Sequence, residues 1–447
     1  MKQIKVLLWF DVEDYLTPES DDAFFKLLQM LDSIGVRATL KFCTRKAAVL
    51  KERGREDILR LLPNHELSFH TTRHSVHPLP TEYLNHYGFR SGTEEFYRRE
   101  KPGFDHLAAI VGQRLTSYGH PGFAWAPQAF AAVRKMGVPT YLDAHPILNV
   151  NGGPFWYEGL FTMSGLVNLI HSRHEPDQFQ RLCRAFDQMD LQGEDVVFLS
   201  VYDHPTELAC TEFWDEVNFA RGKNPSVCRP APLRAAGELE KNIEALRRFL
   251  LYTLEKENVE YITATEAMRY EKSGIEPITV QDLREYARSV DGLVSFSSLG
   301  GRMLCASELF SLLARSLTGR ALIPELLYGP EQDEPSRIRT ETVPVREIAE
   351  AAYGQFETVL GYKQLKSLYP VGENLLNPAD MLCTMAEALR TGVERVPVRR
   401  GRLSAADYVD SAYRFGGNWI LWEESFRAEN VVEATRLQCW TLKPARV

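Results

Sequence analysis

Apolar residues in the first 270 positions follow two alternating patterns. Short, almost uninterrupted apolar runs are typical of strands covered on both faces, and they occur at 4–12, 36–43, 139–145, 194–205 and 259–268. Longer stretches with apolar residues at helical spacing lie between them, at 21–35, 126–138 and 239–257. This repeated order of strand and helix predicts a barrel of parallel strands joined by crossover helices. In such folds the functional residues follow the carboxyl ends of the strands, where Asp11, His70 and His204 are placed.

The pattern changes near residue 277 to helices with little strand. Several segments share a small or polar opening residue, then an acid or its amide, then apolar residues at helical spacing. They lie at 278–290, 305–319, 343–356, 377–392 and 403–415. Segments 305–319 and 377–392 match best, since both end in Thr-Gly, which favours an internal repeat. Independent capped helices would share most of these features, so both interpretations stay open.

Histidine usage also distinguishes the two parts of the chain. All eleven histidines lie between His65 and His204, and none occurs in the following 243 residues. We therefore predict a catalytic domain over residues 1–272 and a mainly helical domain over residues 277–447.

Composition and charge exclude several classes of partner. The net charge is -8 with acids and bases interspersed, which argues against nucleic acid and anionic membranes as partners. No apolar run is long enough to span a membrane, and no cleavage site follows the apolar start. The seven cysteines are scattered without a CxxC pair, as in a protein with reduced thiols. These features predict a cytoplasmic protein.

Histidines and carboxylates are concentrated at two predicted strand ends. "FHTTRHSVHP" contains His70 and His74 four residues apart, a spacing that on a helical turn would place both rings on one side for a shared metal ion. "WFDVEDY" places Asp11, Glu13 and Asp14 after the first strand, where they repel one another unless a cation neutralises them. Strand alternation puts Asp11 and Glu13 on one side. Two choices stay open: Asp14 instead of Glu13 as the carboxylate ligand, and His77 instead of His74.

Four motifs in order carry a resemblance to a known family. They are "DVED", "NHELSFHTTRHS", "YGHPGFAWAPQAFAAVRKMGV" and "YDHPTEL". With them, the first roughly 270 residues resemble the polysaccharide deacetylase family, in its Asp-x-Glu branch. The third motif departs from the family pattern, because His120 stands where the family has an arginine.

The resemblance implies a distorted (β/α) barrel that hydrolyses an N-acetyl group on a sugar. It implies Glu13, His70 and His74 as ligands of one divalent ion, Asp11 as general base and His204 as general acid. Zinc suits mixed imidazole and carboxylate ligands best, and cobalt, nickel or iron would also fit. A bound divalent ion, a carboxylate and a histidine are together a sufficient set for amide hydrolysis.

Further residues are expected around this centre. His120 would hold Asp11 as the family arginine does, though only while protonated. Alternatively it caps the next helix and another arginine serves Asp11. Asp143 and His145 are expected to line the pocket or support it. The aromatic residues proposed as sugar platforms, with plain core packing as the alternative, are Trp125, Trp156 and Tyr157.

The helical remainder weakly resembles pseudomurein-binding repeats, through "LLNPADMLCTMAEALRTG" and "RLSAADYVDSAYRF". That resemblance implies binding of glycan or polymer, and the alternative is a domain that packs on the barrel or forms a homo-oligomer. The function predicted for the whole chain is hydrolysis of a carbon–nitrogen bond in an N-acetylated carbohydrate. The alternatives are a non-catalytic glycan-binding protein and a hydrolase of another small amide, such as a cyclic imide or a formyl group.

Overall fold

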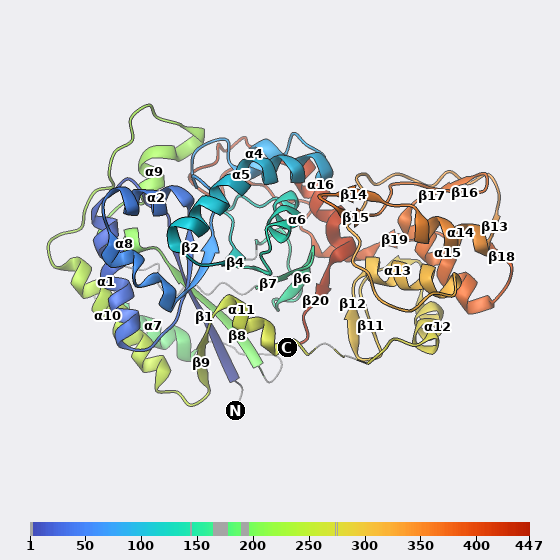
Figure 1. The fold of residues 1–447 in the computed structure, drawn as a ribbon, viewed down its shortest axis with the longest axis horizontal. Coiled ribbons are helices and arrows are strands. Elements are labelled where there is room, and N and C mark those ends of the chain that lie inside the picture. Colours follow the sequence, from blue (N-terminus) through green and yellow to red (C-terminus); the bar gives the residue numbers. More distant parts are fainter. Residues whose placement is uncertain (1–2, 144, 164–177, 189–195, 273, 275) are drawn as a thin grey trace.

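The computed structural model describes residues 3–143, 145–163, 178–188, 196–272, 274 and 276–447. One ten-stranded sheet, mostly parallel, dominates the first part (Figure 1). Its path runs β20-β6-β7-β5-β4-β3-β2-β1-β8, with β9 also pairing with β1. Because the path ends at β8 on one side and β20 on the other, the sheet forms an open, distorted (β/α) barrel. The strands are β1 (Gln3–Val12), β2 (Thr39–Phe42), β3 (Glu66–Phe69), β4 (Leu115–Tyr118), β5 (Thr140–Tyr141), β6 (Phe155–Tyr157), β7 (Leu160–Thr162), β8 (Val196–Asp203), β9 (Val259–Ile262) and β20 (Lys443–Pro444).

Strand β1 lies next to β8, the strand at one end of the path, and is buried along its length except at Gln3. It pairs in parallel with β2, β8 and β9, which explains its uninterrupted apolar sequence. The register pairs Asp11 with Lys41 of β2, so these two residues are lateral neighbours. The carboxyl ends of β1, β3 and β8 meet at one edge, which brings together the residues that follow them.

Helices cover the sheet on its outside. They include α1 (Glu19–Ser33), α2 (Thr44–Glu52), α5 (Phe89–Val111), α6 (Pro127–Lys135), α7 (Gln178–Asp187) and α10 (Glu238–Leu254). The helices predicted at 21–35, 126–138 and 239–257 are confirmed. The long α5 was not predicted, and Pro102, a helix breaker, lies inside it. None of the helices in the described ranges combines the length and apolar character needed to cross a bilayer.

The C-terminal part contains two pairs of helices with β-hairpins between them. In the first, α12 (Val280–Ser289) and α13 (Ala306–Leu317) flank the hairpin β11 (Ser297–Leu299) and β12 (Arg302–Leu304). In the second, α14 (Val345–Gly354) and α15 (Pro378–Thr391) flank two hairpins. These are β14 (Glu357–Val359) with β15 (Tyr362–Gln364), and β16 (Tyr369–Val371) with β17 (Asn374–Leu376). The repeat segments at 278–290, 305–319, 343–356 and 377–392 are therefore helices. The fifth, 403–415, is not an α-helix, since only Ser404–Tyr408 forms a short 3-10 helix.

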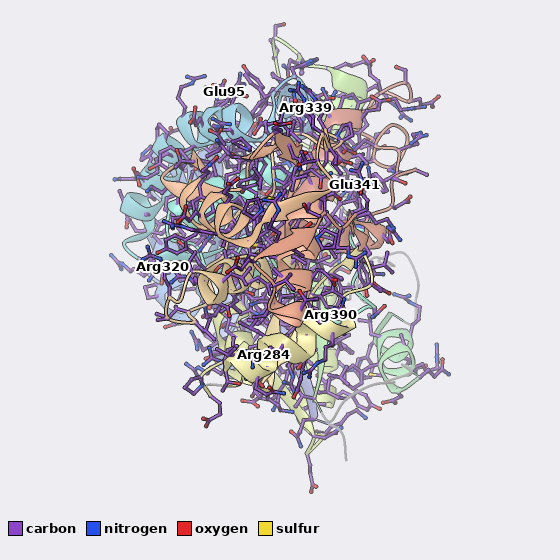
Figure 2. The ribbon with its side chains drawn as sticks, turned by 90° about the vertical axis from the view of Figure 1, so that its right-hand side faces the viewer. Glu95, Arg284, Arg320, Arg339, Glu341 and Arg390 are labelled. Atoms are coloured by element: carbon purple, nitrogen blue, oxygen red, sulfur yellow. The ribbon has the colours of Figure 1, made fainter. Side chains whose placement is uncertain are left out.

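The outer face of this part carries charges of both signs. Figure 2 shows Arg284, Arg320, Arg339 and Arg390 together with Glu341, all of them exposed. The interspersed charges seen in the sequence are thus also interspersed on this surface.

The last 40 residues return to the barrel. Helix α16 (Glu429–Gln438) and β20 lie between the barrel and the C-terminal helices (Figure 1), and β20 pairs with β6. Phe415, Leu421 and Trp422 belong to the apolar cluster that fills the barrel. A second cluster fills the C-terminal part between Ile278 and Trp440. The domain division at residues 272–277 stays a prediction. The last 40 residues follow the helical part in the sequence but pack against the barrel.

A buried ion pair anchors the loop after β1. The Lys46 ammonium contacts Asp21 Oδ1 at 2.5 Å, Ser20 Oγ at 2.9 Å and the Asp14 carbonyl oxygen at 2.5 Å. Both charged side chains are almost fully buried. Asp21→Asn would leave a buried ammonium without its carboxylate, so we expect the free energy of unfolding to fall by about 3 kcal/mol.

The measurement is denaturant unfolding of the full chain. Asp22→Asn is the matched control, because Asp22 pairs with Arg55 while its side chain is 65% exposed, and a surface pair contributes less than about 1 kcal/mol. Equal losses in the two variants would contradict the account.

Candidate metal centre and active site

Glu13, His70 and His74 form a compact buried cluster. Glu13 Oε2 lies 2.7 Å from His74 Nε2 and 3.1 Å from His70 Nε2. Their ligand atoms all lie within 4.8 Å of one another. The other carboxylate oxygen of Glu13 accepts a hydrogen bond from the Trp214 indole N–H at 3.1 Å. Two imidazoles and one carboxylate around a common point are the donor set of a three-ligand zinc site.

A loop with left-handed backbone brings the two histidines together. Thr71 has φ 63° and His74 has φ 54°, so residues 70–74 do not form a helical turn. The ring centroids of His70 and His74 nevertheless lie 4.7 Å apart. His70 Nδ1 donates to the Gly119 carbonyl oxygen at 2.8 Å, which leaves Nε2 with a lone pair directed at the cluster.

A relay of hydrogen bonds orients the ring of His74. Its Nδ1 donates to Ser75 Oγ at 2.5 Å, and Ser75 donates to Asp215 Oδ2 at 3.1 Å. Burial raises the pKa of Asp215 to about 7. Such outer contacts fix the tautomer and direction of a ligating imidazole.

Ser75→Ala should therefore weaken metal binding about 10- to 100-fold without abolishing it. The check is the zinc dissociation constant, measured by competition with a chromogenic chelator. Ser117→Ala is a matched control, because Ser117 is also fully buried but its hydroxyl has no hydrogen-bond partner among the described residues. Unchanged zinc affinity in Ser75→Ala would mean that this relay does not support the centre.

Asp14 and His77, the two alternative ligands, are occupied elsewhere. Asp14 Oδ1 accepts from the backbone N–H groups of Leu16 and Thr17 at 2.9 Å each, and Oδ2 accepts from the Thr206 hydroxyl at 2.7 Å. His77 contacts Glu82 at 2.8 Å through Nδ1 and donates to the Phe219 carbonyl oxygen through Nε2 at 3.1 Å. The geometry therefore favours Glu13 and His74 as ligands.

A buried lysine accompanies Asp11. Lys41 is fully buried, and its ammonium lies 2.9 Å from Asp11 Oδ1 and 3.9 Å from the centroid of the Trp9 ring. A Cβ on Gly119 would lie 2.5 Å from Lys41 Cδ, so this glycine makes room for the lysine. Burial raises the pKa of Asp11, but Lys41, followed by His70 and His204, outweighs it and lowers the pKa to about 2.

His120 contacts Tyr141 and Asp143 rather than Asp11. Its Nδ1 lies 2.5 Å from the Tyr141 hydroxyl oxygen, and its Nε2 lies 3.9 Å from Asp143 Oδ2. Burial, together with Lys41, lowers the pKa of His120 well below its usual range, so it is neutral at pH 7. A neutral imidazole cannot replace a cationic arginine. The cation that contacts Asp11 is Lys41, and among the described residues neither His120 nor an arginine forms an ion pair with Asp11.

His204 lies on the other side of Asp11. Its Nε2 is 3.5 Å from Asp11 Oδ2, and its Nδ1 donates to Glu207 Oε2 at 2.7 Å. Burial lowers the pKa of His204, but the contacts with Asp11 and Glu207 outweigh it and raise that pKa well above its usual range. At neutral pH this histidine is therefore an imidazolium, the form that can donate a proton.

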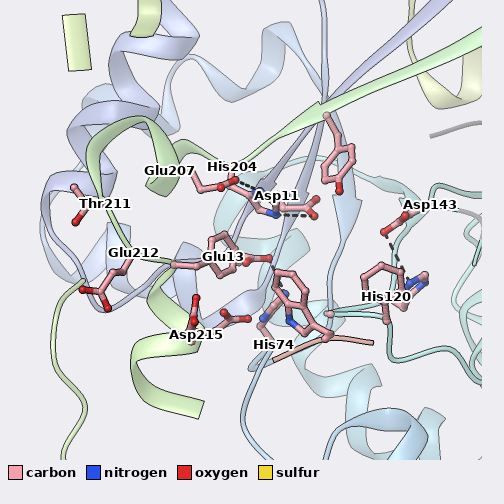
Figure 3. Close-up of a pocket in the computed structure, with 16 residues that line it drawn as sticks. Asp11, Glu13, His74, His120, Asp143, His204, Glu207, Thr211, Glu212 and Asp215 are labelled. Carbon is pink, nitrogen blue, oxygen red and sulfur yellow. Dashed lines mark hydrogen bonds and ion pairs between the residues drawn. The ribbon is translucent and has the colours of Figure 1, made fainter. Parts of the chain in front are cut away.

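These groups surround a cavity of about 440 Å³ (Figure 3). The size falls in the range of small-molecule sites. Asp11, Glu13, His74, His120, Asp143 and His204 line it, and Figure 3 shows them facing one another. Its other polar and aromatic lining residues are Tyr202, Glu207, Thr211, Glu212, Phe213, Asp215, Glu216, Phe123 and Trp419.

Four of the predicted site residues lie outside this lining, and one of them, His70, still contacts Glu13 of the cluster. His145 is buried behind His120, with ring centroids 5.4 Å apart. Trp125 is fully buried and donates to Thr435 Oγ1, and Trp156 donates to Glu271. Trp125 therefore packs in the core, and Trp156 packs outside the cavity with its side chain partly buried. Both positions fit the alternative of packing better than that of sugar platforms.

Sequence reasoning missed Lys41 and Trp419. A lone lysine in the apolar run at 36–43 was a visible signal for the first. No pattern in the sequence indicates the second, because a distant C-terminal segment brings Trp419 to the cavity.

Solved structures similar to part of the chain include polysaccharide deacetylases, the family that the motifs resemble. A probable polysaccharide deacetylase from Pseudomonas aeruginosa PAO1 is 14% identical over 60% of this chain and 90% of its own, with a TM-score of 0.40. An allantoinase is 13% identical over the same shares, with a TM-score of 0.41. A 4-alpha-glucanotransferase from Thermococcus litoralis is 12% identical over 61% of this chain and 41% of its own, with a TM-score of 0.44. No family model and no curated protein sequence matches the chain.

Proposed function

We propose that this protein is a metal-dependent hydrolase that removes an N-acetyl or similar acyl group from an amino sugar or an oligosaccharide. The observation that carries the proposal is one cavity where the buried cluster of Glu13, His70 and His74 meets a carboxylate and an imidazolium. Asp11 and His204 are the two groups, and their protonation states differ because their surroundings differ.

The donor set fits a divalent cation. Glu13 is buried between two imidazoles, and burial would raise its pKa, but His74 and His70 hold that pKa well below its usual range. Seven carboxyl groups line the cavity, and although burial raises the pKa of Asp215 to about 7, the ionised ones outnumber the two cations beside them, Lys41 and His204. The seven carboxyl groups are Asp11, Glu13, Asp143, Glu207, Glu212, Asp215 and Glu216. A divalent ion at Glu13, His70 and His74 would supply a Lewis acid for the acyl carbonyl and for water.

The protein groups would then divide the proton transfers between them. Asp11, kept as a carboxylate by Lys41, accepts the proton of the attacking water molecule. His204, kept protonated by Asp11 and Glu207, donates a proton to the departing amine. The two groups lie 3.5 Å apart, so both reach the same reacting centre.

The non-catalytic alternative loses its main support. It depended on the missing family arginine at position 120, and a binding protein would have no need for a cation beside Asp11. Lys41 supplies that cation from a neighbouring strand. The hydrolase is therefore the better supported of the two functions.

The test is a substrate panel with chemical identification of the released acid. Zinc-loaded protein is incubated with N-acetylglucosamine, its β-1,4-linked oligomers, N-formyl amines and cyclic imides. We expect acetate and free amine in equal amounts from an N-acetylated sugar, lost with a chelator and restored by added metal. If only the imides or the formyl amines give product, the substrate is a different amide and not an N-acetylated sugar. If no compound gives product, the proposed hydrolysis is contradicted.

A further inference from the structure

Part of the cavity wall comes from the far end of the chain. Trp419 lines the cavity together with Phe123 and Phe213. The ring centroid of Trp419 lies 6.0 Å from that of Phe213 and 6.3 Å from that of Phe123. We call these three residues the aromatic wall.

The segment that carries Trp419 is fixed against the barrel. The backbone N–H groups of Arg221 and Gly222 donate to the carbonyl oxygens of Ile420 and Leu421 at 2.9 and 3.0 Å. Gly122, at φ +44°, makes room for this segment, since a Cβ there would lie 2.9 Å from Leu421 Cδ1. The tryptophan therefore has a defined place in the cavity.

The aromatic wall lies beside the group that would protonate the departing amine. The ring centroids of Phe213 and His204 are 4.8 Å apart. An amide substrate places its acyl group at the metal ligands and its amine at His204. The ring that bears this amine must therefore lie next to the aromatic wall.

The ring of Trp419 is the part of this residue that a ligand can reach. Its side chain is only partly buried and lines the cavity. Its indole Nε1 is shielded from water and lies beside Gly122, so Trp419 offers a ligand its ring and not its N–H. By contrast, Trp125 is fully buried in the core and lies outside the cavity lining.

We propose that the aromatic wall is the sugar subsite of the cavity. The apolar face of the pyranose ring that bears the departing amine packs on the ring of Trp419. This inference rests on the proposed function, and it gives the C-terminal segment a direct role in substrate binding.

The test uses the full zinc-loaded chain and di-N-acetylchitobiose as the probe. Binding is measured by calorimetry for the wild type, Trp419→Ala and Trp419→Phe. Trp156→Phe is the matched control, because Trp156 is a partly buried tryptophan outside the cavity. We expect Trp419→Ala to raise the Kd at least about tenfold and Trp419→Phe to raise it less, as for loss of one aromatic anchor. Trp156→Phe should bind as the wild type does, and all variants should keep the same zinc content.

Acetate release is measured in parallel, so the two proposals can fail separately. Sugar binding that Trp419→Ala weakens, without acetate release by the wild type, would support the subsite and refute the hydrolase. Acetate release with the same Kd and KM in Trp419→Ala and wild type would overturn the subsite and leave the hydrolase standing. A wild-type protein that does not bind the disaccharide would also overturn the subsite.

Discussion

Asp11→Asn should keep the metal ion and lower kcat by about 10²- to 10⁴-fold, the usual contribution of a general base. Asparagine has nearly the same shape as aspartate but cannot accept the proton of the attacking water molecule. The cluster of Glu13, His70 and His74 does not include Asp11, so zinc content should not change. The measurements are kcat on the substrate found in the panel and zinc by mass spectrometry.

Glu216→Gln is the control for this experiment. Glu216 also lines the cavity but makes no contact that the proposed mechanism uses. We expect less than about a tenfold change in kcat from the loss of one cavity carboxylate outside the reaction. An Asp11→Asn protein that loses zinc, or turns over like the wild type, would remove Asp11 from the role of base.

Lys41→Met should lower kcat by about ten- to a hundredfold with the metal retained, because the base loses the ion pair that holds it in position. Methionine keeps much of the length and volume of the lysine side chain in its fully buried site. Asp11 would then lose its cationic neighbour at 2.9 Å and with it its fixed orientation. The readouts are kcat, zinc content and the melting temperature.

Lys5→Met separates a local effect from a general one. Lys5 is a second buried lysine of the same sheet, and it pairs with Glu260 near the start of β1, away from the cavity. We expect the Lys5 variant to turn over normally even if its stability falls. Equal kcat losses in the two variants would show that Lys41 acts through stability alone.

The sequence predicts β1, β2, β5, β8 and β9, because parallel strands buried on both faces leave uninterrupted apolar runs. It does not predict the short strands β4, β6, β7 and β20. It also predicts that Asp11, His70 and His204 meet, since the carboxyl ends of parallel strands share one edge. The conformation of the histidine loop could not be predicted. Thr71 and His74 adopt positive φ without being glycine, so no residue type marks the turn.

The cavity walls were harder to predict than its centre. Which aromatic residue faces the cavity depends on tertiary packing, and residue type says nothing about it. Trp125 thus became core, whereas Trp419 reached the cavity from a segment with no periodic pattern. We expected the cation beside Asp11 to be His120, in the third motif. The cation that contacts Asp11 is instead Lys41, which comes from β2.

The tail changes what a truncation would test. Removing everything after Lys272 would take β20 from the sheet and Thr435 from the buried indole of Trp125. Such a truncation would damage the barrel itself. Point substitutions in the full-length chain leave the barrel core intact, so they are the better way to test what each proposed domain does.

The most direct test of the account is the zinc content of the wild type and of the His70→Ala/His74→Ala double variant. Both proteins are stripped with a chelator, loaded with excess zinc and desalted, and circular dichroism confirms that both are folded. We predict a single zinc ion per chain in the wild type and none in the double variant, which should also lack acetate release. A folded double variant that holds as much zinc as the wild type would contradict the metal centre and the function proposed from it.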